Sequence, residues 1–268
     1  MDIGTAKPTV SERRNVRHHM IDIVNPDTNY TVSDFSLTAR PIVDDLLCRG
    51  VQPVLCGGSG LYVDSIVKPM RFAEKSSAPI RNALKSIAAG ENGREELHAR
   101  LAAVDPVAAN RLHPNDIRRV IRALEVYELT GHTITQQQAE DRMCASDYLY
   151  KIFALDWPRE TLYRRINERV DIMIDEGLER EVEKLLDQGL TIDLTSMQGL
   201  GYKEMYYYFI GETTLDQAIQ NIKQGTRHYA KRQLTWLKRS QDVVWLDAQG
   251  RSPDSLANEI LEECKYNG

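Results

Sequence analysis

The sequence has few cysteines and no long apolar run. Its four cysteines, Cys48, Cys56, Cys144 and Cys264, lie far apart and form no C-x-x-C pair. This spacing excludes an ordinary zinc ribbon and argues against a disulfide framework, so we expect reduced structural thiols. No apolar stretch approaches the roughly 18 residues that a membrane-spanning helix needs. The first residues also lack the apolar segment of a signal peptide, and we expect a cytoplasmic protein with no membrane partner.

Several features of metal-binding and phosphate-binding proteins are also missing. No third ligand stands at a suitable spacing from His18, His19 and Asp22, so we expect no protein metal site. No Gly-Lys-Ser or Gly-Lys-Thr tripeptide occurs, which excludes a Walker A loop within this sequence. The net charge of −5 gives no indication of a nucleic-acid partner, but residues 221–240 contain six basic and no acidic side chains. Because charges act over about 10 Å, this local basic segment favours a phosphate-bearing partner.

The composition fits a globular protein, with 42% hydrophobic and 27% charged residues over 268 positions. Short apolar runs predict buried strands at residues 51–56, 150–155 and 243–246. Helical periodicity predicts helices over residues 33–47, 61–67, 117–129, 162–186 with a break at Gly177, and 226–239. Residues 70–98 are polar and are expected to form a mobile loop that leads into a helix. Strands separated by long helices predict an α/β fold with a parallel sheet.

Gly57, Gly58 and Ser59 lie where a predicted strand is followed by a predicted helix. Glycines let a backbone approach an anion closely, and a helix N-terminus presents free N–H groups and the positive end of its dipole. The segment is therefore a candidate phosphate-binding loop. The open alternative is an ordinary glycine turn, because such turns often follow strands.

A second candidate phosphate-binding surface lies on the predicted helix over residues 117–129. At about 100° per residue, Arg118, Arg119 and Arg122 fall on one side of this helix. The apolar side chains of the opposite side are Ile117, Val120, Ile121 and Leu124. Guanidinium groups suit a diphosphate or an RNA backbone because they present paired donors to phosphate oxygens. The alternative is a solvated face with local ion pairs, for example from Arg122 to Glu125 or Glu128.

Two further segments combine the residue types of RNA-binding surfaces. The predicted helix over residues 226–239 carries Arg227 and Lys231, and neutralisation of phosphates by such residues makes binding strongly salt-dependent. Residues 198–203 combine glycines with Tyr202 and Lys203, and RNA enzymes use such segments to stack on bases near an extruded nucleotide. The alternative for residues 198–203 is a tight turn between helices in which Tyr202 packs.

Several ordered motifs resemble those of the tRNA dimethylallyltransferases, which are also called tRNA isopentenyltransferases. The motifs are Asp2–Pro8, His18–Ile23, Gly57–Tyr62, Leu112–Asp116, Arg122–Val126, Gly199–Lys203 and Thr226–Gln233. The resemblance runs from Asp2 to about Trp245, nearly the whole chain. Ser59 stands where the family usually has threonine, and Arg17 stands where proline is common. The zinc finger of eukaryotic members is missing, so the chain is more similar to bacterial forms.

The resemblance implies a P-loop NTPase-like parallel sheet flanked by helices. The α/β core would span residues 1–158 and 226–268, and a helical tRNA-binding lobe would span residues 159–225. The implied reaction transfers a dimethylallyl group from dimethylallyl diphosphate to N6 of the adenosine just 3′ of the anticodon in tRNA. Mg²⁺ and arginines would neutralise the leaving diphosphate. The family's nucleotide-binding P-loop and general-base aspartate precede the first motif, so we expect both upstream of Met1 and no catalytic residue within this sequence. We also expect a monomeric enzyme.

The resemblance also implies binding residues, within these motifs and outside them. For diphosphate or tRNA these are Gly57, Gly58, Ser59, Arg81, Arg118, Arg119, Arg122, Arg227 and Lys231. For tRNA alone they are Ile117, Val120, Ile121, Gln198, Gly199, Leu200, Gly201, Tyr202 and Lys203. Two other functions stay open: an adenylate isopentenyltransferase acting on a free nucleotide, and a catalytically inactive tRNA-binding fragment. The basic segments favour tRNA, because a free nucleotide needs no anticodon-binding surface.

Overall fold

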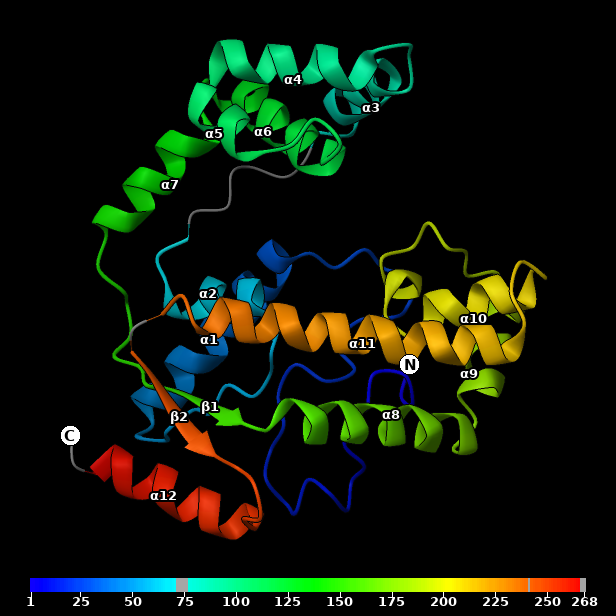
Figure 1. Cartoon of the computed structure of the whole chain (residues 1–268). Coiled ribbons are helices and arrows are strands. Elements are labelled where there is room, and N and C mark those ends of the chain that lie inside the picture. The colour runs from blue at the N-terminus through cyan, green and yellow to red at the C-terminus, as the bar shows by residue number, and fades with distance from the viewer. Residues whose placement is uncertain (71–76, 241, 266–268) are drawn as a thin grey trace. The chain divides into compact units, whose positions relative to one another are not determined.

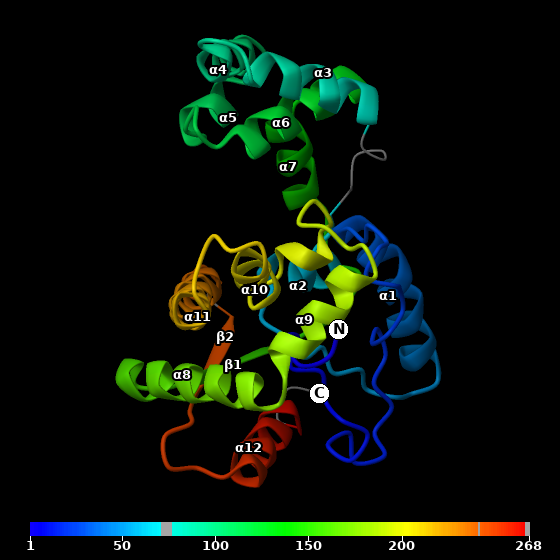
Figure 2. The same cartoon turned by 90° about the vertical axis from the view of Figure 1, so that its right-hand side faces the viewer.

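The chain forms two compact units in a computed structural model that describes residues 1–70, 77–240 and 242–265. The first, which we call the α/β unit, comprises Met1–Val63 and Tyr150–Gly268. The second, the helical unit, comprises Asp64–Leu149. Figure 1 labels the helices and strands of both units, and Figure 2 gives a perpendicular view. This division differs from the boundaries expected from the sequence, which assigned residues 64–149 to the core and made residues 159–225 the separate lobe.

The sheet of the α/β unit pairs two parallel strands among the described residues. Strand β1 (Ile152–Asp156) runs parallel to β2 (Val243–Asp247), so the strands predicted at residues 150–155 and 243–246 are confirmed. Ala154 and Leu246 are buried. Helix α12 (Pro253–Lys265) packs on the sheet through Leu256.

The third predicted strand, at residues 51–56, is wrong for the described residues. The N–H of Val51 donates to the carbonyl of Leu46, which closes the end of the preceding helix α1 (Val32–Cys48). Val54 is 84% exposed, so the apolar run that suggested a strand does not lie in a buried layer. The segment is an irregular connection that leads from α1 to the glycine loop.

The helices of the α/β unit are α1, α2 (Gly60–Val67, which begins in this unit), α8 (Arg159–Asp175), α9 (Leu178–Asp187), α10 (Tyr202–Phe209), α11 (Leu215–Leu237) and α12, with a short 3₁₀ turn at Ser196–Gln198. The helices predicted over residues 33–47, 61–67 and 162–186 are confirmed, whereas the one predicted over residues 226–239 begins earlier, at Leu215, and α10 and α12 were not predicted. Thr31 caps α1: its side chain accepts from the N–H of Asp34, whose carboxylate accepts from the N–H of Thr31. Gly177, with φ +101°, separates α8 from α9 as predicted.

Residues 159–225 do not separate from the α/β unit because α11 is one continuous helix across residue 225. It lies beside α8, where Lys223 forms an ion pair with Asp171 at 2.5 Å (Figure 1). A buried core joins α8–α11, and Met1 and Ile3 pack against that core. The N-terminal segment consequently lies next to α9 (Figure 2).

The helical unit contains α3 (Ala78–Ala88), α4 (Gly93–Val104), α5 (Pro106–Arg111), α6 (Ile117–Thr130) and α7 (Ile134–Met143). Their core is formed by Leu84, Leu97, Leu101, Ala108, Ala109, Val120, Ile121, Ala123 and Leu124. The helix predicted over residues 117–129 is confirmed as α6. The loop predicted over residues 70–98 is wrong where it meets α3 and α4, because Ser77 caps α3 and Leu84 and Leu97 are buried. Residues 71–76 of that loop lie outside the described residues.

Candidate functional site

The glycine loop, residues 57–60, is fixed against one face of α11. A Cβ on Gly58 would lie 1.9 Å from Nε2 of Gln233, and a Cβ on Gly60 would lie 2.5 Å from the Trp236 ring. The Ser59 hydroxyl forms a 2.8 Å hydrogen bond with the hydroxyl of Tyr229. These three α11 side chains share one side of the helix because they are spaced by four and three residues. Glycine at residues 58 and 60 is therefore required for close packing.

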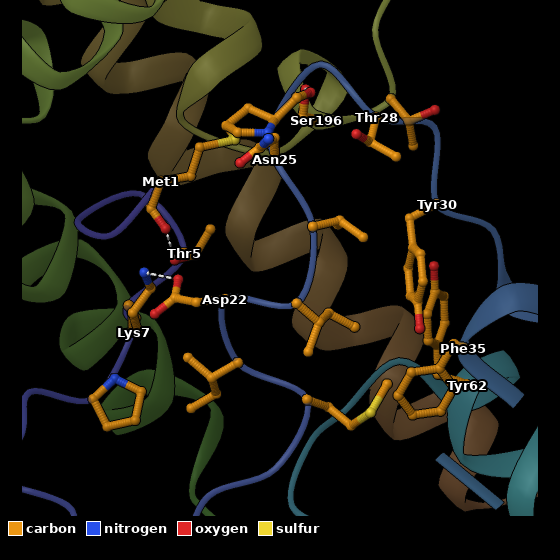
Figure 3. A pocket seen from close by; sticks show the side chains of 18 residues that line it. Met1, Thr5, Lys7, Asp22, Asn25, Thr28, Tyr30, Phe35, Tyr62 and Ser196 are labelled. Carbon is orange, nitrogen blue, oxygen red and sulfur yellow. Dashed lines mark hydrogen bonds and ion pairs between the residues drawn. The ribbon is translucent and has the colours of Figure 1, made fainter. Parts of the chain in front are cut away.

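Two cavities of the α/β unit share the side chains of Phe35 and Tyr62, and the smaller of the two lies at this loop. The smaller, of about 220 Å³, is lined by residues 55–59 together with Phe35, Tyr62 and Val63. The larger, of about 700 Å³, is lined mainly by residues 5–8 and 20–26 and again by Phe35 and Tyr62. The Phe35 and Tyr62 rings, from α1 and α2, lie 4.9 Å apart and form part of both walls. Figure 3 shows these rings and Tyr30 on one side of the larger cavity, with Lys7 and Asp22 on the other.

The wall of the larger cavity holds an unusual backbone. Ala6, Met20 and Asp22 have φ values of 51°, 64° and 55°, a region that residues other than glycine seldom adopt. Such residues cost about 1–3 kcal/mol each and concentrate at functional sites. The Lys7 ammonium pairs with the carboxylates of Asp2 and Asp22, and these hydrogen bonds raise the pKa of Lys7. The wall is therefore held in a strained form by a cation that stays charged.

Tyr30 contributes a polar atom that the fold leaves without a partner. Its hydroxyl oxygen is buried and has no hydrogen-bond partner among the described residues. Tyr30 lines the larger cavity beside Phe35 and Tyr62 (Figure 3). Buried hydroxyls normally find a partner, and a ligand atom would reach this one only after the neighbouring side chains move. No motif pointed to Tyr30, because it lies in a loop outside the recognised motifs.

Residues 198–203 fold as a turn into α10, and Tyr202 lies in the core. Its side chain is 1% exposed, and its hydroxyl donates to the carboxylate of Glu181. Burial and the Glu181 carboxylate raise the pKa of Tyr202 above its ordinary range. This buried position does not fit the expectation that Tyr202 contacts tRNA. The ring packs against Gly4, where an added Cβ would lie 2.5 Å from Cε2 of Tyr202. The packing alternative does fit.

The other predicted residues of this turn have mixed exposure. Gly201 is buried with φ +93°, and its N–H donates to Glu204. Leu200 packs against α11, where a Cβ on Gly225 would meet it at 2.7 Å. Gln198 is exposed, whereas Gly199 and Lys203 are half-buried. Gln198 and Lys203 therefore provide the accessible polar side chains of the predicted tRNA segment.

Arg227 and Lys231 of α11 do not join the glycine loop. Arg227 is half-buried, donates to Oδ1 of Asn167 at 2.6 Å and lies 6.0 Å from the centre of the Tyr163 ring, both on α8. Arg227 thus faces α8, on the side of α11 away from Tyr229. Lys231 is exposed.

Four predicted arginines belong to the helical unit. Arg118 and Arg119 are exposed, and Arg119 pairs with Asp116 at 2.9 Å. Arg81 and Arg122 instead converge on the buried carboxylate of Glu125, at 2.8 and 2.9 Å. The local Arg122–Glu125 pair was an alternative in the sequence interpretation. The contact from α3 was missed, because residues 81 and 125 are 44 positions apart and no local spacing joins them.

The apolar residues of α6 predicted to contact tRNA are mostly in the core. Val120 is 0% exposed and Ile121 is buried, while Ile117 is half-buried. The spacing of Val120 and Ile121 places them on the face that packs against α3 and α4, so neither is exposed to a partner in this structure.

A glycine loop at a helix start and clustered guanidinium groups are together typical of a phosphate-binding α/β protein. The family model for IPP transferase matches residues 1–240, and the chain belongs to this family. A tRNA dimethylallyltransferase of Carboxydothermus hydrogenoformans is 43% identical over 100% of this chain and 86% of its own length. One of Desulforudis audaxviator is 46% identical over 97% of this chain and 84% of its own length.

Two solved structures share the fold. A tRNA isopentenylpyrophosphate transferase of Bacillus halodurans aligns with a TM-score of 0.71 and 40% identity, over 99% of this chain and 82% of its own. A eukaryotic dimethylallyltransferase acting on tRNA aligns with a TM-score of 0.83 and 25% identity, over 99% of this chain and 69% of its own. The fold is therefore the mixed, mostly helical α/β fold of tRNA isopentenyltransferases. None of the helices in the described ranges is long and apolar enough to cross a membrane.

Proposed function

We propose that this protein is a tRNA dimethylallyltransferase. It transfers a dimethylallyl group from dimethylallyl diphosphate to N6 of the adenosine just 3′ of the anticodon. The observation that carries the proposal is the 2.8 Å contact between Ser59 and Tyr229, 170 residues apart. It joins the glycine-loop motif to the Thr226–Gln233 motif, and both belong to the pattern by which the sequence resembles this family.

The larger cavity supports transfer to a nucleobase. Its volume of about 700 Å³ lies within the roughly 300–1,000 Å³ of small-molecule sites. Aromatic rings at Tyr30, Phe35 and Tyr62 provide flat apolar surfaces on which an extruded base stacks. The Tyr30 hydroxyl then donates to an acceptor on the bound base, and the apolar walls exclude water from the allyl group.

The glycine loop supports binding of the diphosphate. The position of a Cβ on Gly57 has no heavy atom within 4 Å, so the backbone there is open to a bound group. The Ser59 hydroxyl, held by Tyr229, lies at the start of α2 where free N–H groups favour an anion. Arg118, Arg81 and Arg122 of the helical unit suit phosphates of the tRNA.

Mg²⁺ is the counter-ion expected from the family resemblance. Among the described residues no group of three or more histidine, cysteine or carboxylate side chains could hold a metal. The cavity carboxylate of Asp22 already pairs with Lys7. These side chains do not fit a metal cage, so we assign no step to a protein-bound ion, and the Mg²⁺ requirement is tested by chelation.

The finer properties of the enzyme are also proposals. We infer a P-loop NTPase-like fold, supported by the parallel β1–β2 pair and the glycine loop before α2. We further propose a monomer in the cytoplasm, where a tRNA-modifying enzyme meets its substrate. Light scattering on the purified protein measures the mass, and a value of twice 30.6 kDa would contradict a monomer.

The direct test is a prenylation assay with unmodified tRNA and labelled dimethylallyl diphosphate, with and without EDTA. It is run on this chain and on a chimera that adds the residues of the Carboxydothermus relative outside the alignment. We expect label in tRNA in at least one version, and none after chelation. Label in free AMP but not in tRNA would indicate an adenylate isopentenyltransferase. Binding of tRNA without transfer in both versions would indicate an inactive tRNA-binding protein.

Tyr30→Phe tests the cavity. The lost hydroxyl has no partner among the described residues, so the free energy of unfolding should not fall. A neutral hydrogen bond to the substrate contributes roughly 1 kcal/mol, so kcat/KM should fall roughly fivefold. Ser86→Ala, which removes a hydroxyl bonded to Asn82 on the surface of α3, is the matched control and should leave kcat/KM unchanged. Unchanged kcat/KM in Tyr30→Phe would contradict binding of the base beside Tyr30 in this cavity.

A further inference from the structure

A single carboxylate organises the arginines of the helical unit. Glu125, on α6, has a fully buried side chain. Its Oε2 accepts from Nη2 of Arg81 on α3 and from Nη1 of Arg122 on α6. Its Oε1 is buried without a hydrogen-bond partner among the described residues. Both guanidinium groups therefore meet at one oxygen atom, next to the apolar core of the unit.

Stability alone does not account for this arrangement. A buried carboxylate loses hydration, and replacing a buried ion pair with an apolar side chain of similar volume is often neutral or stabilising. The unpartnered Oε1 adds to that penalty. The core of α3, α4 and α6 is already formed by residues such as Leu84, Leu97 and Leu124. The carboxylate must therefore be explained by what it holds.

What Glu125 holds is two cations that stay accessible. The side chains of Arg81 and Arg122 are 38% and 35% exposed. A guanidinium has five N–H donors, and each of these two uses one of them on Glu125. The donors on the exposed part of each guanidinium can bind an anion, and the three groups together carry one net positive charge.

We propose that Glu125 is a positioning residue that orders Arg81 and Arg122 for a phosphate of the tRNA backbone. This inference rests on the proposed function only in naming tRNA as the ligand. A free arginine loses rotamer freedom when it binds phosphate, whereas an anchored arginine has lost it already. The common anchor also fixes the spacing between the two guanidinium groups, which a diffuse positive charge does not do.

The test measures tRNA affinity of the whole chain at several salt concentrations, with the variant Glu125→Gln. This change adds one positive charge, so electrostatics alone predicts tighter binding and a steeper salt dependence. Positioning predicts the reverse: binding on the order of tenfold weaker, as when a supporting partner of a ligand residue is removed. The slope of log affinity against log salt should become shallower by about one, the value of one lost phosphate contact.

The matched control is Glu128→Gln, which makes the same charge change on an exposed residue of the same helix. We expect it to leave tRNA affinity unchanged or slightly tighter. Weaker binding in Glu125→Gln alone supports positioning, whereas equal behaviour of the two variants overturns it. Wild-type protein without tRNA affinity would overturn the proposed function, and this inference with it.

Glu125→Leu separates positioning from a structural role. An apolar side chain of similar volume should keep the helical circular dichroism signal and the melting temperature while it loses the same affinity as Glu125→Gln. A variant that melts early but binds tRNA normally when folded would show a merely structural role. Combining Glu125→Gln with Arg81→Gln and Arg122→Gln should add nothing to the loss caused by the two arginine changes, because Glu125 acts through them.

Discussion

Glu181 in the α/β unit and Glu125 in the helical unit both anchor neighbouring groups, but the two carboxylates hold different things. In the α/β unit, Glu181 accepts hydrogen bonds from the N–H groups of Asp2 and Ile3, at 2.9 and 2.7 Å, and from the hydroxyl of Tyr202. All three donors are neutral, and two belong to the backbone. Glu181 therefore fixes the path of the N-terminal segment, which lines the larger cavity at residues 5–8.

In the helical unit, Glu125 accepts hydrogen bonds from two charged side chains. Among the described residues, no backbone N–H donates to it. Glu125 therefore fixes the orientation of two guanidinium groups and does not hold the main chain. Under the proposals made above, the cavity depends on an ordered main chain, whereas the surface proposed for tRNA depends on ordered side chains. The predictions that follow test whether the α/β unit depends on packing and neutral bonds and the helical unit on charge.

The largest effect is expected for Tyr202→Ala. Truncation of a fully buried aromatic side chain costs about 3–5 kcal/mol, so the free energy of unfolding of the α/β unit should fall by that amount. Tyr202→Phe keeps the ring and removes only the bond to Glu181, and should cost about 1 kcal/mol. Trp157, Trp236 and Trp245 all lie in the α/β unit, so tryptophan fluorescence in denaturant reports on this unit. If Tyr202→Ala lowers the free energy of unfolding by less than Tyr202→Phe does, the packing role of the ring is contradicted.

Gly60→Ala should have the next largest effect. The added Cβ would lie 2.5 Å from the Trp236 ring, and overpacking of this kind costs about 1–3 kcal/mol. Gly57→Ala is the matched control in the same loop, because nothing lies within 4 Å of its Cβ position. Its stability should stay within about 0.5 kcal/mol of wild type. Equal fluorescence-detected unfolding of the two variants would mean that α11 does not fix the loop.

Glu181→Gln should cost about 1–2 kcal/mol, since an amide group cannot accept all three hydrogen bonds and a part-buried N–H is left unsatisfied. The loss should be the same at low and high salt, because the donors are neutral. Glu179→Gln, which affects one bond to Tyr208 at 3.1 Å, is the control and should cost less than about 0.5 kcal/mol. A loss that shrinks as salt is added would show that charge, and not neutral hydrogen bonding, anchors the N-terminal segment.

The sequence predicts what local spacing encodes. The periodic segments of α1, α6 and the α8–α9 pair were identified because their apolar residues repeat within a few positions and Gly177 ends one of them. The Arg122–Glu125 pair could be predicted for the same reason, since three positions on a helix place side chains together. The apolar run at residues 51–56 misled because burial depends on neighbours that the run does not specify.

Contacts between distant segments were not predictable in the same way. Glu181 is one of several acidic residues on α9, and nothing in its surroundings in the sequence points to Asp2 and Ile3, more than 170 positions away. The Ser59–Tyr229 contact was not predicted either, although both residues lie in recognised motifs. The units of the structure have other boundaries than the predicted domains, because α11 continues across residue 225 and composition does not reveal that continuity.

The smallest effects are expected from pH, and they should separate the two units. Burial raises the pKa of Glu125, but hydrogen bonds and charges from Arg81 and Arg122 outweigh it, so the net pKa lies below the ordinary value of 4.5. Burial likewise raises the pKa of Asp105, and bonds from Ala108 and Thr135 again outweigh it and leave it below 3.8. The unfolded chain binds more protons in this window, so the helical unit loses stability as pH falls below about 4.5.

The α/β unit should respond most at the opposite end of the pH scale. The pKa of Tyr202 is raised by burial and by Glu181, so the folded state keeps its proton where the unfolded state has lost it, and stability falls as pH rises above 10.0. The pKa of Asp2 is lowered by Lys7, but its side chain is 66% exposed and such pairs contribute little. In acid, therefore, helical circular dichroism should decrease before tryptophan fluorescence changes, because the helical unit contains no tryptophan. Simultaneous loss of both signals in acid would contradict the comparison, in which the helical unit depends on charge and the α/β unit on packing and neutral hydrogen bonds.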